Sequence, residues 1–345
     1  MTTISTEQLY GCLLGGAVGD TLGLPAEGIG GKRIRRLWKG EWRQRLCFGR
    51  GMFSDDTEHA MATASALIEH RNNEELFVRF LARKLRWWFA ALPAGTGMAT
   101  AKAIIRLWIG VSPNKSGVCS AGNGPTMRSA IIGLVFADEA ATRRAFTRAA
   151  CWLTHKDPRA IEAAILTAEA SACAAHGIDN EDVVRLLEQE ITSDEMKSRW
   201  EQLKVCLASK MSVEEFASAI GCANYVSGFA PNTLAVVLYA WLRHRGDFKT
   251  AMEAVLNCGG DVDTLGAVLG GIMGIECGES GIPKAWVDGI AEWPRPVSYL
   301  RRLSEAFAGK IVPRYAWWGV PFRNLYFLVI VLCHGVRRLF PPYGR

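Results

Sequence analysis

The sequence has no pair of cysteines in a Cys-x-x-Cys arrangement, although ten cysteines occur in its 345 residues. Zinc modules and dithiol redox motifs need such close pairs, so the pattern excludes both classes. Residues 1–7 are polar and lack the basic stretch and apolar run of a targeting sequence. These absences predict a cytoplasmic protein with reduced, mostly buried thiols.

Strand signals are equally scarce. The runs of β-branched residues are short, and the sequence has no series of segments in which apolar and polar residues alternate. Residues 74–92, 158–176 and 231–244 instead carry apolar side chains at helical spacing. With 49% hydrophobic and 21% charged residues, the chain has the composition of a globular protein. We predict an all-α protein whose residues 1–310 form a single compact bundle.

Charge of one sign is also limited. The formal net charge is +6, which favours phosphates or acidic partners only mildly. The sequence shows no zinc-ligand spacing, helix-turn-helix signature or aromatic RNA-binding pattern. We therefore expect no nucleic-acid partner.

The C-terminal extension, residues 311–345, has a different character. Its apolar run 325–332 is shorter than the roughly 20 residues that cross a bilayer, so no transmembrane span is expected. Two interpretations stay open. The extension forms a helix docked on the domain, or a helix in a membrane interface with Arg337 and Arg338 near the headgroups. The length of the run favours docking.

Two clusters of hydroxyl and carboxylate side chains lie far apart in the sequence, each at the predicted start of a helix. Ser, Thr and Asp are common helix caps, so each cluster alone fits ordinary capping. Crowded carboxylates repel one another, however, and need a compensating cation when they are buried. Oxygen ligands suit Mg²⁺ or Mn²⁺, so we predict one metal site shared by both segments. The clusters are Ser54, Asp55 and Asp56, and Asp261, Asp263 and Thr264.

Three further features are candidates for chemistry. Glu27 lies in an apolar, glycine-rich stretch where desolvation would raise its pKa toward general-acid use, although a solvated loop carboxylate fits equally well. The glycine-rich segment 120–124 leads into a predicted helix at Pro125 and can cradle an anion. His155 lies just before the predicted helix cap Asp157, where it is either structural or in contact with a ligand.

Two neighbouring segments complete the expectations for the N-terminal part. Four glycines in the predicted helix 9–22 indicate very close packing against another backbone, because glycine otherwise weakens a helix. The basic segment 32–50 has no clear period and is expected to form a loop near the site.

These motifs, in this order, resemble the ADP-ribosylglycohydrolase family, the relatives of the enzyme that reactivates dinitrogenase reductase. The resemblance spans roughly residues 8–275. It implies an orthogonal all-α bundle with a central binuclear site for two Mg²⁺ or Mn²⁺ ions. The segments that carry it are Gly11–Asp20 with Pro25–Gly28, Ser54–Thr57, Gly122–Gly124 with Met127 and Arg128, Thr154 and His155 before Pro158, and Gly259–Ala267.

The resemblance also implies roles for single residues. Glu27 matches the family's flexible glutamate next to the metals, and many relatives have threonine where this chain has Ser54. We expect Glu27 and Asp56 to be the catalytic residues, with Asp56 or its neighbours assisting the attacking water and Glu27 orienting or protonating. The implied metal ligands are Ser54, Asp55, Asp56, Asp261, Asp263 and Thr264. The implied substrate-binding residues are Ser120, Gly122, Asn123, Gly124 and His155.

The implied activity is hydrolysis of the bond between ADP-ribose and a modified protein side chain, first of all an arginine guanidinium. Two divalent cations would hold the ribose hydroxyls and polarise a water, while carboxylates stabilise an oxocarbenium-like sugar. ADP-ribosyl-serine and O-acetyl-ADP-ribose are alternative substrates. An immunity protein that binds an ADP-ribosyltransferase toxin is an alternative of another class, although the intact ligand set favours a hydrolase.

Overall fold

Helices dominate the computed structural model, which describes residues 4–38, 40–309, 311–338 and 340. Within these residues, strand pairing is limited to β1 (Ile29–Gly30), β2 (Gly259–Gly260) and isolated bridges. The predicted all-α fold is confirmed. The α-helices are α1 (Thr6–Gly23), α2 (Gly31–Leu37), α3 (Asp55–His70), α4 (Glu74–Ala90), α5 (Met98–Trp108), α6 (Pro113–Ser116), α7 (Ala130–Val135), α8 (Ala140–Trp152), α9 (Pro158–His176), α10 (Asn180–Glu188), α11 (Asp194–Ala208), α12 (Val213–Ala219), α13 (Ala230–Arg243), α14 (Phe248–Leu256), α15 (Val262–Cys277), α16 (Lys284–Asp288), α17 (Val297–Gly309) and α18 (Val320–Arg337). Four 3-10 helices cover Leu24–Ala26, Thr126–Arg128, Glu279–Gly281 and Trp317–Gly319.

Helix starts follow local capping chemistry. Ser5 and Gln8 form a reciprocal capping box at α1, and Ser212 and Glu215 form another at α12. The Asp157 side chain accepts a hydrogen bond from the first turn of α9. Ser5, Asp157 and Ser212 can be recognised as caps in the sequence, because these hydrogen bonds involve neighbouring residues alone.

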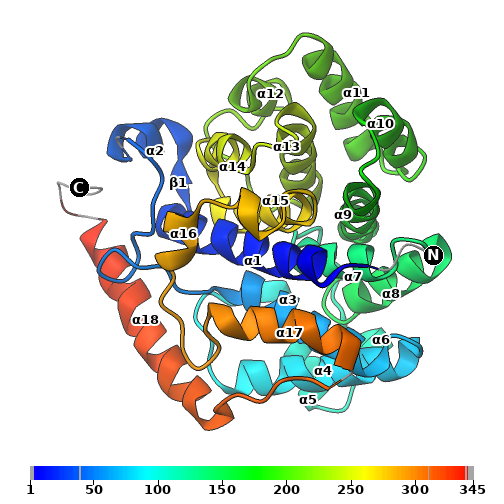
Figure 1. Cartoon of the computed structure of the whole chain (residues 1–345), viewed down its shortest axis with the longest axis vertical. Helices are drawn as coiled ribbons and strands as arrows, with labels where there is room; N and C mark the ends of the chain where they lie inside the picture. The colour runs from blue at the N-terminus through cyan, green and yellow to red at the C-terminus, as the bar shows by residue number, and fades with distance from the viewer. Residues whose placement is uncertain (1–3, 39, 310, 339, 341–345) are drawn as a thin grey trace.

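The centre of the molecule is a pair of antiparallel helices, α1 and α15, joined through glycines (Figure 1). A Cβ added to Gly15 would lie 2.2 Å from the Gly270 carbonyl oxygen, and one added to Gly270 would lie 2.1 Å from the Gly15 oxygen. One turn along, a Cβ on Gly19 would lie 2.0 Å from the Gly266 oxygen. The predicted backbone contact of the glycine-rich helix is confirmed. It sets the end of α1 beside the start of α15.

Replacing Gly270 with alanine is expected to destabilise the protein by about 3 kcal/mol or more, because the new methyl group would overlap a backbone that cannot move away. Gly335 is a matched helical control, since a Cβ there would meet nothing within 4 Å. Gly335→Ala should change the free energy of unfolding by less than about 1 kcal/mol. Urea denaturation measures both. Equal effects would contradict the close packing of α1 and α15.

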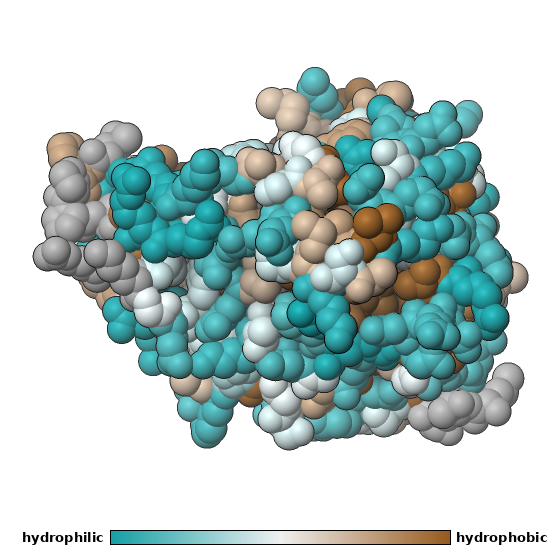
Figure 2. Space-filling model, turned by 90° about the horizontal axis from the view of Figure 1, so that it is seen from above, coloured by the Kyte–Doolittle hydropathy of each residue, from teal (hydrophilic) through white to brown (hydrophobic). Residues whose placement is uncertain are grey.

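The remaining helices surround this pair. In Figure 1, α3, α4 and α17 lie on one side and α9, α13 and α14 on the other. The face seen from above in Figure 2 is mostly hydrophilic, with hydrophobic residues gathered in one smaller area. The core is deep enough to bury Trp200, Trp241 and Tyr239 almost completely. Burial of large aromatic side chains stabilises this arrangement of helices.

The expected loop at 32–50 is wrong in its first part, which forms α2. Only Ile34 and the glycine at its start are buried in this short helix, so its sequence has too few apolar positions to show a period. Tertiary contacts hold the segment instead. Trp38 and Trp42 stack with their ring centroids 5.7 Å apart, and the Trp42 indole donates to the Asn257 side chain at 3.2 Å.

The C-terminal helix α18 runs along the outer edge of the molecule (Figure 1). Its Phe327 packs against Leu46, Cys47 and Met52. With the preceding 3-10 turn it spans Trp317–Arg337, 21 residues that are long and apolar enough to cross a membrane by length and composition alone. The length argument from residues 325–332 therefore underestimates this helix, and the lack of a membrane span stays a prediction.

Candidate active site

The two predicted clusters meet beside the end of α1. The Asp20 carboxylate accepts hydrogen bonds from the backbone N–H groups of Ser54 at 2.9 Å and Thr57 at 3.3 Å, so α1 caps the start of α3. At the start of α15, the Thr264 hydroxyl donates to Asp56 Oδ2 at 3.3 Å. These contacts bring together two segments that lie 208 residues apart in the sequence.

Glu27 reaches the same site through the small β-sheet. Gly28 donates its N–H to the Gly260 carbonyl at 2.7 Å, next to the antiparallel pairing of β1 with β2. Gly260 has φ +95°, and a Cβ there would lie 2.0 Å from a neighbouring carbonyl oxygen. As a result, carboxylate oxygens of Glu27, Asp261 and Asp263 lie within 4.8 Å of one another.

Crowding and burial perturb these acids strongly. Burial raises the pKa of Asp56 well above its usual value, and the charge of Asp55 raises it further. Burial and the charge of Glu27 do the same to the pKa of Asp263. Burial also raises the pKa of Asp20 to about 6, despite the hydrogen bonds that it accepts. Without a counter-charge, the fully ionised cluster opposes folding.

The donor set fits a hard divalent cation. Oδ1 of Asp56 and Oδ1 of Asp263 are buried without a hydrogen-bond donor among the described residues. Such unsatisfied acceptors are costly in a folded protein. The hydroxyls of Ser54 and Thr264 each lie 3.3 Å from Asp56 Oδ2 and add neutral oxygen donors. Mg²⁺ or Mn²⁺ prefers this mixture of carboxylate and hydroxyl oxygens.

Glu27 is exposed, unlike the buried acids of the cluster. Partial enclosure of its carboxyl group raises its pKa, the charge of Asp261 raises it further, and Arg338 acts in the opposite direction. The Arg338 guanidinium also donates to the Glu27 carbonyl oxygen at 2.7 Å. The end of α18 therefore contacts the loop that carries Glu27.

The glycine-rich loop 120–124 lies against the segment 226–229. Backbone hydrogen bonds connect the two, including one of 3.0 Å from the N–H of Asn123. The Asn123 side-chain nitrogen donates to Asp261 Oδ2 at 2.7 Å and to the Thr233 hydroxyl at 3.0 Å. Both N–H groups of this amide are thus used within the protein. Asn123 therefore orients Asp261.

His155 lies directly behind this loop and is buried. A Cβ added to Gly122 would lie 3.2 Å from its Nε2, and one added to Gly124 would lie 3.1 Å from its Cε1. Its Nδ1 forms a hydrogen bond of 2.9 Å with the Thr154 hydroxyl. Burial, followed by the positive charge of Arg128, lowers the pKa of His155 to about 3. The imidazole is therefore neutral at physiological pH.

We expect the imidazole of His155 to show no titration between about pH 5 and pH 8, because its folded pKa lies far below the unfolded value of about 6.5. The unfolded state then binds the extra proton as the pH falls below 6.5, and stability decreases. NMR of the histidine ring protons tests this, with His155→Gln to assign the resonance. A ring that titrates near pH 6.5 would contradict the buried environment.

Sequence reasoning missed several residues that shape the site. Asp20 belongs to a segment that carries the family resemblance, but its role in capping α3 was not predicted. Arg128 is fully buried and forms a hydrogen bond of 3.2 Å with His59 Nδ1. In the sequence, only its place in a family motif indicates that it matters. Segment 226–229 contributes backbone groups, and such a role leaves no signal in side-chain patterns.

Comparison with known proteins supports the predicted family. A model of the ADP-ribosylglycohydrolase family matches residues 1–317. An uncharacterised protein of Archaeoglobus fulgidus is 29% identical, over 83% of this chain and 92% of that protein. The ADP-ribosyl-[dinitrogen reductase] glycohydrolase of Rhodospirillum rubrum is 25% identical, over 81% and 89%.

An ADP-ribosylarginine hydrolase of Pseudomonas putida is also 25% identical, over 86% of this chain and 79% of that protein. Among solved structures, a chain of an ADP-ribosylglycohydrolase-related protein complex superposes with a TM-score of 0.69 and 27% identity. That match covers 88% of this chain and 98% of the other. The family predicted from the motifs is confirmed, and this chain belongs to the ADP-ribosylglycohydrolase family.

Proposed function

We propose that this chain is a metal-dependent hydrolase that releases ADP-ribose from a modified protein side chain, with ADP-ribosyl-arginine as its first substrate. The meeting of Asp56, Asp261 and Asp263 at two helix N-termini, with buried oxygens that lack donors, supports the proposal most strongly. Two relatives named above act, by their names, on ADP-ribosyl-dinitrogen reductase and ADP-ribosylarginine.

In this proposal the acidic cluster holds the cations and surrounds the reacting sugar. Two Mg²⁺ or Mn²⁺ ions bound there would supply Lewis-acid polarisation of the ribose hydroxyls and of a water. The surplus negative charge of the carboxylates would stabilise the positive charge that develops on the anomeric carbon. The ligands would be Ser54, Asp55, Asp56, Asp261, Asp263 and Thr264.

Glu27 is suited to proton transfer. Because its pKa is raised, Glu27 keeps its proton to a higher pH than an ordinary glutamate does, and its exposure lets it reach a leaving group. Once deprotonated, the same carboxylate can orient a water. Asp56 would assist from the buried side, where the hydroxyls of Ser54 and Thr264 fix its orientation.

The glycine-rich loop would hold the rest of the substrate. Backbone N–H groups in a glycine turn bind phosphate oxygens well, and residues 120–124 lie beside Asp261. The neutral ring of His155 would support this loop without adding charge. We place the reaction in the cytoplasm, in keeping with ten cysteines that are all unpaired.

The experiment is incubation of the full chain with arginine- and serine-ADP-ribosylated proteins, with and without EDTA. Release of ADP-ribose from the arginine conjugate is expected only with free divalent cations, and added Mg²⁺ or Mn²⁺ should restore it after chelation. Release from the serine conjugate alone would assign the other linkage. Full release in EDTA would contradict a metal-dependent site.

A further inference from the structure

We propose that the outer face of α18 is a docking surface for a membrane that contains anionic lipids, with the domain attached to the other face of the helix. The proposal concerns a surface on the outside of the molecule and does not depend on the hydrolase chemistry.

The outer face of α18 is apolar along its whole length. Phe322, Leu325 and Leu332 keep 60% or more of their surface exposed, and Val329 and Val336 continue the same stripe at intervals of three and four residues. A water-soluble protein rarely leaves a continuous apolar helix face uncovered, and such faces mark sites of interaction.

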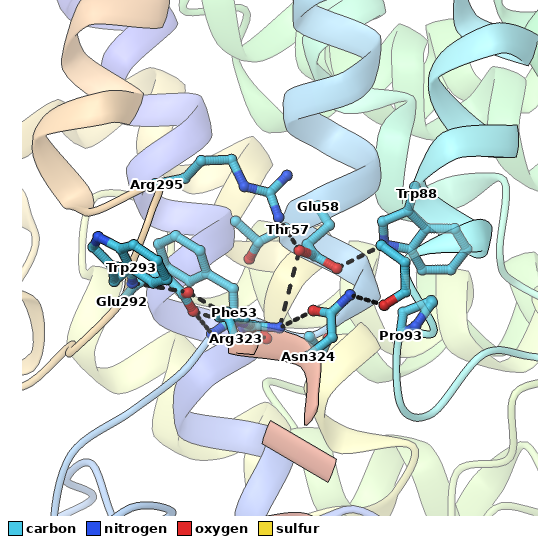
Figure 3. A network of polar contacts seen from close by, with 12 residues as sticks. Phe53, Thr57, Glu58, Trp88, Pro93, Glu292, Trp293, Arg295, Arg323 and Asn324 are labelled. Atoms are coloured by element: carbon cyan, nitrogen blue, oxygen red, sulfur yellow. Dashed lines mark hydrogen bonds and ion pairs between the residues drawn. The ribbon is translucent and has the colours of Figure 1, made fainter. Parts of the chain in front are cut away.

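The inner face of the same helix carries its polar groups, and the domain satisfies them. Arg323 is buried and donates to Glu292 at 2.6 Å and to the backbone oxygen of Phe53 (Figure 3). The Asn324 side chain donates to the Ala91 carbonyl at 2.8 Å. If α18 crossed a bilayer, Arg323 would lose these partners in a medium that penalises an unpaired charge. The helix is therefore suited to lie along a surface, with its outer side facing the lipid.

The charges of the extension match an anionic surface. Residues 311–345 contain five arginines and no aspartate, glutamate or lysine. The exposed Arg314 and Arg337 flank the apolar face at its two ends. Arginines close to anionic headgroups favour membrane binding. Between these two ends, the outer face has no charged residue.

The same charges disfavour a second copy of the chain as the occupant. Two α18 helices packed antiparallel would bring Arg337 of each copy toward Arg314 of the other, and parallel packing would pair identical arginines. The extension has no acidic residue to offset this repulsion. The outer face also lacks the charged flanks that select a partner helix in coiled coils. An anionic membrane supplies the missing negative charge.

The start of the face has the aromatic character of an interfacial helix. Trp317 and Trp318 are exposed there, and tryptophan is enriched at the boundary between lipid and water. A cavity of about 580 Å³, lined by Trp87, Lys84 and Trp317 among others, adjoins this end. Glu58 also lines the cavity and is paired with Arg295, so Lys84 is the cation left to meet a headgroup, and the aromatic walls suit an acyl chain.

Vesicle co-sedimentation of the full chain tests the proposal, with phosphatidylcholine vesicles compared with vesicles that also contain phosphatidylglycerol. Binding to the anionic vesicles is expected to be at least roughly tenfold tighter and to weaken as salt is added. No binding to either type, or equal binding to both, would overturn the proposal.

The helix face is tested by the double variant Leu325→Glu and Leu332→Glu, which should weaken vesicle binding at least roughly tenfold. Leu186→Glu with Val205→Glu is the matched control, because these side chains are exposed on other helices and should leave binding unchanged. Arg314→Gln with Arg337→Gln changes charge alone and should remove the preference for anionic lipid. Circular dichroism verifies folding.

Three results would assign another occupant and overturn the proposal. The first is vesicle binding that the leucine variant and its control lose equally. The second is a dimer that the leucine variant dissociates, without any vesicle binding by the wild type. The third is a membrane-bound protein that high salt does not release and only detergent releases, as expected for a helix that spans the membrane.

Discussion

Replacing Asp263 with asparagine is expected to lower hydrolysis by at least about 100-fold, since it removes a charged ligand from the proposed metal site. The asparagine is nearly the same size, so the packing at the start of α15 should be retained. Initial rates of ADP-ribose release at saturating Mg²⁺ or Mn²⁺ provide the measurement. Asp194→Asn is the control, because Asp194 also lies in the first turn of a helix but is exposed and outside the site.

The same substitution should stabilise the metal-free protein. Asp263 is buried beside other acids that raise its pKa, so removing its charge relieves both desolvation and repulsion. In EDTA, the variant should melt at a higher temperature than the wild type, and it should gain less stability on addition of cations. A variant that loses activity and also becomes less stable in EDTA would contradict a role confined to metal binding.

The contribution of the acidic cluster to the stability of the metal-free chain is expected to fall as the pH rises from about 4 to 8. The pKa values of Asp55, Asp56 and Asp263 lie well above those of an unfolded chain, and that of Asp20 is about 6. Over this window the four carboxyl groups hold more protons in the folded state than in the unfolded state, so they give the unfolding free energy a negative slope with pH, which the buried His155 opposes below about pH 6.5. Each proton of difference contributes about 1.4 kcal/mol per pH unit.

Urea denaturation at several pH values, in EDTA and in excess Mn²⁺, measures this effect. Bound cations stabilise the ionised carboxylates, so the slope should become flat or change sign in Mn²⁺. Asp263→Asn should have a shallower slope in EDTA than the wild type. Identical profiles with and without Mn²⁺ would mean that the cluster does not bind the ion.

The sequence was informative wherever structure depends on local chemistry or on a strict repeat. The cap Asp157 locates the start of α9 because its hydrogen bond involves a neighbouring residue only. The glycines repeated along α1 predicted a contact between helix backbones, because only a residue without a side chain lets two backbones come so close. The repulsion between neighbouring carboxylates predicts a cation site shared by the two segments, and the structure places Thr264 of one segment in contact with Asp56 of the other.

The features that the sequence did not predict depend on contacts between segments that lie far apart in the chain. The approach of Glu27 to Asp261 depends on the pairing of β1 with β2, two strands of two residues each. Such short strands leave no alternation of apolar and polar residues in the sequence. The helix α2 is held by hydrogen bonds from Lys32 and Arg35 to Asn224 and Asn257 rather than by an apolar stripe of its own. The outward face of α18 depends on Arg323, a charged residue that the domain binds in its interior.

Anomalous diffraction from crystals grown with Mn²⁺ tests the central claim most directly. We predict manganese peaks in contact with carboxylate oxygens from both the start of α3, at Asp55 or Asp56, and the start of α15, at Asp261 or Asp263. Peaks held by one of these segments alone, or no peak between them, would contradict the claim that acids from the two ends of the chain share their cations.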